Sequence, residues 1–260
     1  VATVQEMLRT DTWLVPTLQD KIRSTKPPLT AWITAAAVSR QTMNDISSPD
    51  RNVRERGFRS LGWETRWPAL LAACATLVLT AEMGRLVAGP TCGLLALAAA
   101  ATSLLFLRFC RYSTTDVQLM LWVTAANVLL LHAILEKRVW LGYVGAGAAL
   151  GLAMMSKGPI ALLQSVVPIG IWALAWRRSF PATGTSSQDG LRKALPLLCG
   201  VTVFLAVGFW WYVLVLLRDP HIAEIWWREV TRQGATDAPP DRWYAYAAFI
   251  PYQAPWLIFF

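Results

Sequence analysis

Long stretches without a charged residue dominate this chain and restrict it to a membrane environment. A helix needs about 20 apolar residues to cross the hydrocarbon core of a bilayer, and six stretches without Asp, Glu, Lys or Arg reach or approach that length. They are Leu86–Leu107, Val117–Leu135, Val139–Ser156, Gly158–Trp176, Ala194–Leu217 and Trp243–Phe260. A seventh, Trp67–Ala81, is shorter and would span with Glu82 and Arg85 at the membrane surface. The sequence therefore predicts an all-α, polytopic integral membrane protein with about seven transmembrane helices.

Composition agrees with this prediction and limits the classes of molecule that we expect the chain to bind. Only 15% of the 260 residues are charged, against about 25% in a typical soluble domain. The formal net charge is +8, but the basic residues lie between the apolar stretches. Anionic membrane lipids or phosphate-bearing substrates are therefore the expected partners, and nucleic acid is not.

The chain divides into a polar part, residues 1–66, and a transmembrane domain, residues 67–260. The apolar patch LTAWITAAAV at 29–38 is too short to span and is predicted to be an amphipathic or re-entrant segment on the membrane surface. Residues 39–62 are rich in charges and turn formers, so we interpret them as a solvated loop.

Alternation of the spans assigns each connecting segment to one of two membrane faces. Residues 1–66, 108–116, Lys157 and 218–242 share one face; Arg85, 136–138 and 177–193 share the other. Lysine and arginine counts in the short loops tie, so the positive-inside rule does not fix the orientation.

Lys26 stands out because two prolines follow it, in the stretch STKPPL. Proline fixes φ and removes a backbone donor, so Lys26 is held on a stiff, non-helical segment. This pattern predicts a cation at a fixed position.

Three further polar positions lie at or near the ends of predicted helices on the same face as Lys26. Asp116 begins a span and is either a helix cap or part of a site. Lys157 lies in a turn between two spans and is either a lysine that extends to the surface or a phosphate ligand. Arg232 follows Arg228 by four residues on one helix face. We expect Lys26, Lys157 and Arg232 to approach the phosphate of a lipid near Asp116, because a mixed set of Lys and Arg suits that anion.

Cofactor and metal signatures are absent from the sequence. There is no Gly-rich phosphate loop and no dinucleotide fingerprint. The four cysteines fall in apolar segments without metal-type spacing and are interpreted as inert thiols. His132 is interpreted as packed or hydrogen-bonded. No cofactor and no metal site are therefore predicted, and nothing supports a divalent cation.

Four motifs, in the same order and separated by predicted spans, carry a resemblance to a known superfamily. They are EMLRTDTWLVPTLQDKIRSTKPPLTAW, STTDVQLMLW, GLAMMSKGPIALL and FWWYVLVLLRDP with WWREVTRQ after it. The chain resembles the C-type, polyprenyl-phosphate-sugar-dependent glycosyltransferases, which include protein O-mannosyltransferases and lipid A aminoarabinose transferases.

The resemblance implies a bacterial inner-membrane enzyme that moves a sugar from a polyprenyl-phosphate carrier to a lipid, protein or glycan acceptor at the outer face. Residues 1–66 would then be an extracytoplasmic loop with interfacial helices. The transfer would be an inverting displacement with a carboxylate as general base. The principal catalytic Asp is expected upstream of Val1, so we interpret the chain as a fragment of the family's full length.

The resemblance also suggests roles for individual residues. Lys26, Lys157 and Arg232 would contact the carrier phosphate, and Asp116 would be the second acidic residue of the site. The aromatic side chains of Trp210, Trp211 and Tyr212 would contact lipid or sugar, although an aromatic belt at the membrane surface explains them equally well.

A second interpretation stays open. The chain could be a non-catalytic or truncated homologue that serves as a structural subunit of a larger complex with other membrane subunits. A transporter is a weaker alternative, because the charges lie at the ends of the spans and not within them.

Overall fold

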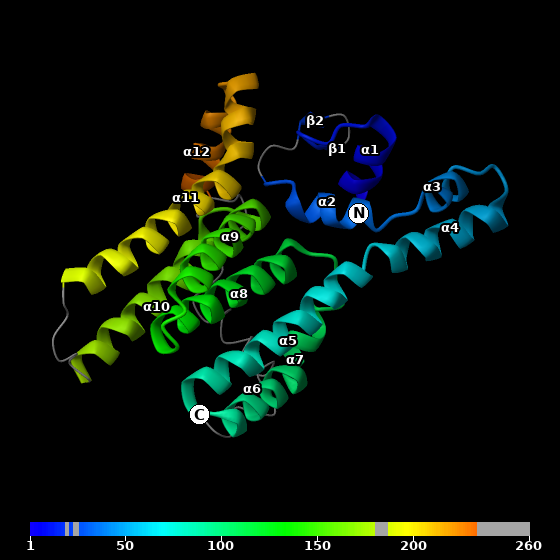
Figure 1. Cartoon of the computed structure of the whole chain (residues 1–260). Coiled ribbons are helices and arrows are strands. Elements are labelled where there is room, and N and C mark those ends of the chain that lie inside the picture. The colour runs from blue at the N-terminus through cyan, green and yellow to red at the C-terminus, as the bar shows by residue number, and fades with distance from the viewer. Residues whose placement is uncertain (19–20, 23–25, 180–186, 233–260) are drawn as a thin grey trace. The chain divides into compact units, whose positions relative to one another are not determined.

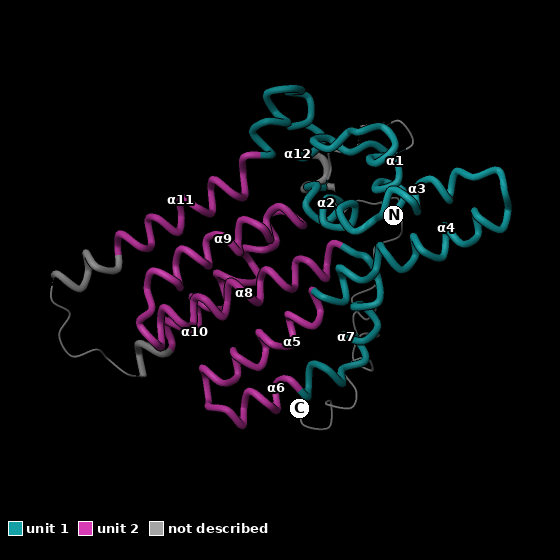
Figure 2. Tube along the Cα trace, turned by 45° about the vertical axis from the view of Figure 1, so that its right-hand side comes forward, with its two compact units in different colours: residues 1–71, 98–114, 211–260 teal, residues 72–97, 115–210 magenta. Residues whose placement is uncertain are grey.

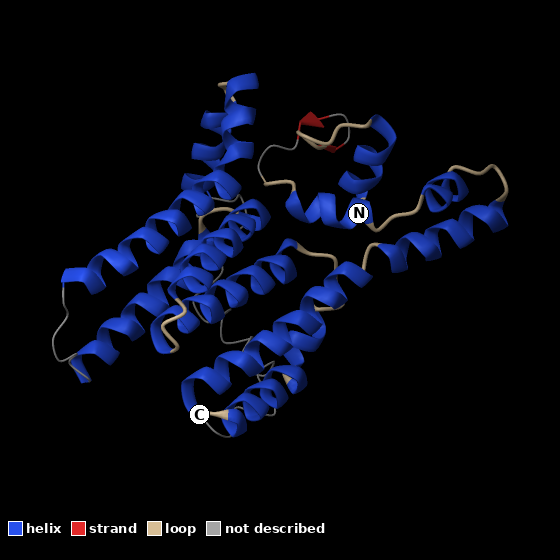
Figure 3. Cartoon of the chain, in the orientation of Figure 1, coloured by secondary structure: helices blue, strands red, loops and turns tan. Residues whose placement is uncertain are grey.

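Helices form almost all of the computed structural model, which describes residues 1–18, 21–22, 26–179 and 187–232 (Figure 1; Figure 3). The strand structure among these residues is one antiparallel pair of two-residue strands, in which Thr17 pairs with Ile22. The elements in order are α1 Ala2–Thr10, β1 Thr17–Leu18, β2 Lys21–Ile22, α2 Leu29–Ala36, α3 Arg40–Ile46, α4 Arg51–Glu64, α5 Trp67–Ala88, α6 Pro90–Thr102, α7 Leu104–Phe109, α8 Thr115–Leu135, α9 Val139–Lys157, α10 Ile160–Ser179, α11 Ser187–Arg218 and α12 Ile222–Arg232. The predicted all-α class is confirmed.

Four helical segments in the described residues are long and apolar enough to cross a membrane: Arg51–Ala88, Thr115–Leu135, Val139–Lys157 and Ala194–Arg218. Two shorter apolar helices, Pro90–Thr102 and Ile160–Ala175, bring the number of apolar helices of ten or more residues in the described part of the chain to six. The predicted span Trp243–Phe260 lies outside the described residues. A total of seven spans therefore stays a prediction.

The predicted span Leu86–Leu107 is wrong as a single helix. Gly89 adopts a left-handed φ of 88° between α5 and α6, and Pro90 then starts α6. At the far end, Ser103 has extended backbone angles and separates α6 from α7. Gly89 and Pro90 interrupt the helix at the first place and the extended backbone of Ser103 at the second, although the hydropathy of the stretch is continuous.

The chain forms two compact units (Figure 2). Unit 1 consists of residues 1–71, 98–114 and 211–260, and unit 2 of residues 72–97 and 115–210. The division at residue 66 that we predicted from composition stays a prediction.

Unit 1 gathers three segments that are far apart in the sequence. Helices α1 and α2 pack through the buried side chains of Val4, Met7 and Ala35. Residues Leu29–Ala36 of the apolar patch are helical, and its place on the membrane surface stays a prediction. Thr34 and Ser113 pair through their hydroxyl groups at 3.4 Å. Two of the segments assigned to one membrane face by alternation, 1–66 and 108–116, are thus in contact within this unit.

Residues 39–62 are not the loop that we expected, because two capped helices occupy them. The Ser39 hydroxyl accepts a hydrogen bond from the Thr42 amide at 3.1 Å and starts α3; the Asp50 carboxylate accepts from the Asn52 amide at 2.8 Å and starts α4. Glu64, at the end of α4, accepts hydrogen bonds from the Ser39 amide and the Thr42 hydroxyl. The two caps stabilise the starts of α3 and α4, and the hydrogen bonds of Glu64 join the end of α4 to the start of α3.

Unit 2 is built on the hairpin of α8 and α9, against which α10 packs. Small residues on α9 allow close approach of its neighbours. A Cβ placed on Gly151 would lie 2.7 Å from the Val207 side chain, and one on Gly147 would overlap the carbonyl oxygen of Gly200. Glycine contacts of this kind are typical of helices that pack in membranes.

Candidate functional site

Asp116 and Lys157 meet at one end of the α8–α9 hairpin, both in unit 2. Asp116 lies in the first turn of α8, and Lys157 is the last residue of α9. The Lys157 ammonium donates a hydrogen bond to the Asp116 carboxylate and forms an ion pair with it. Sequence alternation placed the two residues on the same face, and the structure brings them into contact.

The local sequence explains why Lys157 is available at this point. Gly158 follows it with a left-handed φ of 82°, and its amide donates to the Met154 carbonyl at 2.8 Å, which ends α9. Ser156, immediately before, is buried and bonds the Leu152 carbonyl. Lys157 is therefore the point at which the chain leaves the buried hairpin.

The ion pair is open to solvent, with the Asp116 side chain 48% and the Lys157 side chain 39% exposed. Ion pairs of such exposure contribute about 0–1 kcal/mol to stability. The lysine can therefore exchange the carboxylate for a stronger anion at small cost. A phosphate, with more charge and more acceptor oxygens, is such an anion.

Lys26 belongs to unit 1 and lies directly before α2. Its side chain is exposed, whereas Pro27 and Pro28 are buried. The Pro28 carbonyl accepts the first hydrogen bond of α2, from the Trp32 amide at 2.9 Å. The buried prolines fix the residues that follow Lys26 and leave the lysine exposed, and its role as a fixed cation stays a prediction.

Arg232 is the last residue of α12, also in unit 1. Its side chain lies outside the described part of the chain. The predicted approach of Lys26, Lys157 and Arg232 to one phosphate stays a prediction.

The aromatic positions near the end of α11 differ in their environments. Trp210 is 40% exposed, whereas Trp211 is fully buried. The Trp211 indole donates a hydrogen bond to the Leu14 carbonyl at 2.6 Å, so it ties the N-terminal segment to α11 within unit 1. Tyr212 packs edge-on against Trp211 and Trp226, with both ring centroids at 5.1 Å. Contact of Trp210, Trp211 and Tyr212 with lipid or sugar stays a prediction.

A second polar cluster lies at the opposite end of the hairpin, and the sequence did not predict it as a unit. The two ring nitrogens of His132 lie 3.2 Å from Glu82 and 2.9 Å from Glu136. Arg85 bonds both carboxylates, at 2.6 Å to Glu82 and 3.3 Å to Glu136, and Arg138 lies 3.1 Å from Glu136. The prediction of a hydrogen-bonded His132 is confirmed. The i, i+4 spacing of His132 and Glu136 was the available signal for this pair.

The hydrogen bond with His132 holds the pKa of Glu136 below its ordinary value, with Arg85 and Arg138 acting in the same direction against partial desolvation. The cluster thus links α5, α8 and the turn between α8 and α9 by charge. Within the described residues, no group of three His, Cys, Asp or Glu side chains is placed to hold a metal ion.

Comparison with known proteins identifies the family. The profile of the dolichyl-phosphate-mannose-protein mannosyltransferase family matches residues 57–212. An undecaprenyl phosphate-alpha-4-amino-4-deoxy-L-arabinose arabinosyl transferase of Sodalis glossinidius is 26% identical over 67% of this chain and 29% of its own length. The corresponding transferase of Pectobacterium carotovorum is 28% identical over 97% of this chain and 42% of its own length.

The fold is also that of a solved structure. ArnT from Cupriavidus metallidurans bound to undecaprenyl phosphate superposes over the whole of this chain and 44% of its own, with a TM-score of 0.75 at 18% identity. The chain thus spans less than half the length of these proteins. The resemblance to the C-type glycosyltransferases is confirmed, and the chain belongs to the dolichyl-phosphate-mannose-protein mannosyltransferase family of integral membrane proteins.

Proposed function

We propose that this protein takes part in the transfer of a sugar from a polyprenyl-phosphate carrier to an acceptor outside the cytoplasmic membrane. The observation that carries the proposal is the exposed Asp116–Lys157 ion pair at the end of the α8–α9 hairpin. Family membership supports the reaction class. Two relatives are named as transferases that use an undecaprenyl phosphate-linked arabinose, which supports the carrier.

The chemistry follows from the charges. Transfer of the sugar leaves a phosphate with additional negative charge, so a cation beside it stabilises the transition state more than the ground state. In our proposal Lys157 supplies that charge, and Asp116 holds the ammonium in place before the carrier arrives. Lys26 and Arg232 are proposed as further phosphate contacts, and Trp210, Trp211 and Tyr212 as contacts for lipid or sugar.

The membrane arrangement is part of the proposal. The six apolar helices α5, α6, α8, α9, α10 and α11 and the apolar stretch Trp243–Phe260 would make seven spans. The Asp116–Lys157 end of the hairpin would face outward from a bacterial inner membrane, and the Glu82–Glu136 cluster would face the cytoplasm. A cysteine at Lys157 would then react with a membrane-impermeant maleimide in intact spheroplasts, and a cysteine at Arg138 would not.

The direct test measures transfer of a radiolabelled sugar from a polyprenyl-phosphate donor by the full-length protein in membranes. Lys157→Ala and Asp116→Asn should each reduce transfer. The matched control is the exposed pair of Arg51 and Glu55 on α4, joined at 3.0 Å. Arg51→Ala removes a comparable ion pair and should leave transfer unchanged.

Unchanged transfer in both Lys157→Ala and Asp116→Asn would remove the site assignment. If the full-length protein transferred no sugar with any polyprenyl-phosphate donor, while a partner enzyme failed to assemble without it, the structural-subunit interpretation would take its place.

A further inference from the structure

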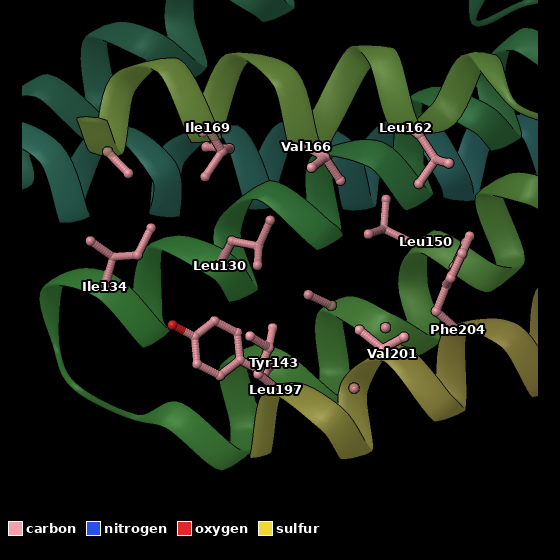
Figure 4. Close-up of a pocket in the computed structure, with 15 residues that line it drawn as sticks. Leu130, Ile134, Tyr143, Leu150, Leu162, Val166, Ile169, Leu197, Val201 and Phe204 are labelled. Carbon is pink, nitrogen blue, oxygen red and sulfur yellow. The ribbon is translucent and has the colours of Figure 1, made fainter. Parts of the chain in front are cut away.

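An apolar cleft of about 330 Å³ lies in unit 2, and neither Asp116 nor Lys157 is among its lining residues (Figure 4). Residues of helices α8, α9, α10 and α11 line it. The lining residues that define its length are Ile134 and Tyr143 at one end and Leu162 and Phe204 at the other.

The lining shows what kind of molecule the cleft can hold. Of the fifteen lining residues, Tyr143 alone has a polar side-chain atom. Water in such a space would lack the two to four polar partners that it needs. Because α8, α9 and α11 are long and apolar enough to span a membrane, the cleft lies where the available molecules are lipids. Hydrocarbon is the filling that matches its walls.

The length of the cleft matches one leaflet. Its lining on α10 runs from Leu162 to Ala173, which is about 16 Å at 1.5 Å per residue. The hydrocarbon core of a bilayer is about 30 Å thick. The cleft therefore extends over roughly half the core, the depth that one acyl chain of a phospholipid reaches.

Basic residues stand at the end of the cleft that holds Ile134 and Tyr143. The turn after α8 contains Lys137 and Arg138 within a few residues of these lining positions, and Lys137, Arg138 and Trp140 are exposed. Arg138 already forms an ion pair with Glu136 at 3.1 Å, so Lys137 is the better candidate for the headgroup. An anionic headgroup and an interfacial tryptophan are typical neighbours at this depth.

We propose that the cleft binds one acyl chain of an anionic glycerophospholipid from the leaflet on the side of residues 136–138, with its headgroup beside Lys137. Lys137 and Lys157, the lysine proposed for the carrier phosphate, lie at opposite ends of the α8–α9 hairpin, so we assign the headgroup beside Lys137 to a phospholipid and make the polyprenyl-phosphate carrier an outcome that the test distinguishes. This inference therefore concerns a second lipid site, and its test does not depend on sugar transfer.

Gly170 offers a substitution that fills the cleft without a clash. It lines the cleft, and a Cβ added there would meet no atom within 4 Å. Replacement of glycine inside a helix also favours the helix. Gly170→Phe should therefore fold and occupy the space of the acyl chain. Ile171→Phe is the matched control, because the neighbouring side chain is 64% exposed outside the cleft.

The experiment titrates the purified full-length protein in detergent with dioleoyl-phosphatidylglycerol and counts bound lipids by native mass spectrometry. Each methylene of the bound acyl chain that the new side chain displaces should raise Kd about fourfold. If Gly170→Phe displaces two, its Kd for the lipid should rise roughly 15-fold. Ile171→Phe should bind as the wild type does. Gly170→Leu, a smaller filling side chain, should show an intermediate loss, and the thermal unfolding of all variants verifies that they are folded.

The headgroup is tested separately. Lys137 has a left-handed φ of 58°, so Lys137→Asn removes the charge with a residue that tolerates this backbone. Binding of phosphatidylglycerol should fall about fivefold, and binding of zwitterionic phosphatidylcholine should not change. The proposal is overturned if folded Gly170→Phe binds phosphatidylglycerol as the wild type does. Recovery of a polyprenyl phosphate, or of a second copy of the chain, as the species displaced by Gly170→Phe would overturn it as well.

Discussion

Loss of the Lys157 side chain should separate stability from catalysis. The two partners are 39% and 48% exposed, and an ion pair in such surroundings contributes at most about 1 kcal/mol. Lys157→Ala should therefore lower the free energy of unfolding by less than about 1 kcal/mol. Thermal unfolding in detergent should barely distinguish the variant from the wild type.

The catalytic effect should be larger. A hydrogen bond from a charged group is worth about 1.5–3 kcal/mol, so loss of the ammonium beside the departing phosphate should reduce kcat/KM about 10- to 100-fold. Lys157→Arg keeps the charge but changes its shape and position, so we expect an intermediate loss.

A double-mutant cycle with Asp116→Asn tests whether the two residues act as one unit. If Asp116 acts by holding Lys157, the double variant should be no less active than Lys157→Ala alone, because the carboxylate has nothing left to hold. The assay is kcat/KM for the polyprenyl-phosphate sugar, with Arg51→Ala on α4 as control.

Two results would refute this reasoning. If the losses in the single variants simply added in free energy, Asp116 and Lys157 would act independently. If Lys157→Ala lost activity only in proportion to a loss of folded protein, the ion pair would be structural and the cation would have no role in transfer.

Three further predictions concern packing and charge. Gly147→Leu should force α9 away from the α11 backbone and lower the free energy of unfolding by about 1–3 kcal/mol, measured by unfolding in mixed micelles. Trp211→Phe should leave the Leu14 carbonyl without its indole donor, cost about 1–3 kcal/mol, and speed proteolysis of the N-terminal segment. The hydrogen bond with His132 lowers the pKa of Glu136 in the folded protein. The ionised Glu136 side chain should therefore contribute its full stabilisation above the ordinary glutamate pKa of about 4.3, and this contribution should be lost as the pH falls through the lowered pKa of the folded state. Glu136→Gln should flatten that acid dependence in unfolding followed against pH.

The hydropathy of the chain predicted the spanning helices of unit 2 closely. The predicted span Val117–Leu135 corresponds to α8, and Val139–Ser156 to α9. Lipid offers no hydrogen-bond partner for backbone N–H and C=O groups, so an uncharged stretch of this length satisfies them internally by forming a helix. Hydropathy did not predict the breaks at Gly89 and Ser103, because backbone angles and not polarity set them.

The charged segment at 39–62 shows the opposite failure. Its composition is typical of a solvated loop, yet Ser39 and Asp50 cap two helices there, and Glu64 reaches back across 25 residues to Ser39. A cap is visible in a sequence, but the distant partner that makes it effective is not.

The candidate site could be predicted as residue types and faces but not as contacts. Asp116 and Lys157 are separated by 41 residues, and their contact depends on the register of the α8–α9 hairpin. That register follows from close glycine contacts such as Gly142 against Ala133. The sequence contains those glycines but does not say which neighbour each one faces.

The hydrogen bond from Trp211 to Leu14 has a consequence for biosynthesis. Its partners are 197 residues apart, so a ribosome adding about 5–20 residues per second needs roughly 10–40 s to make the second after the first. During that interval several apolar helices are synthesised while the segment around Leu14 lacks this hydrogen bond. The small core of Val4, Met7 and Ala35 joins α1 and α2 without any residue from α11. Residues 1–36 therefore have contacts of their own that can form before Trp211 is synthesised.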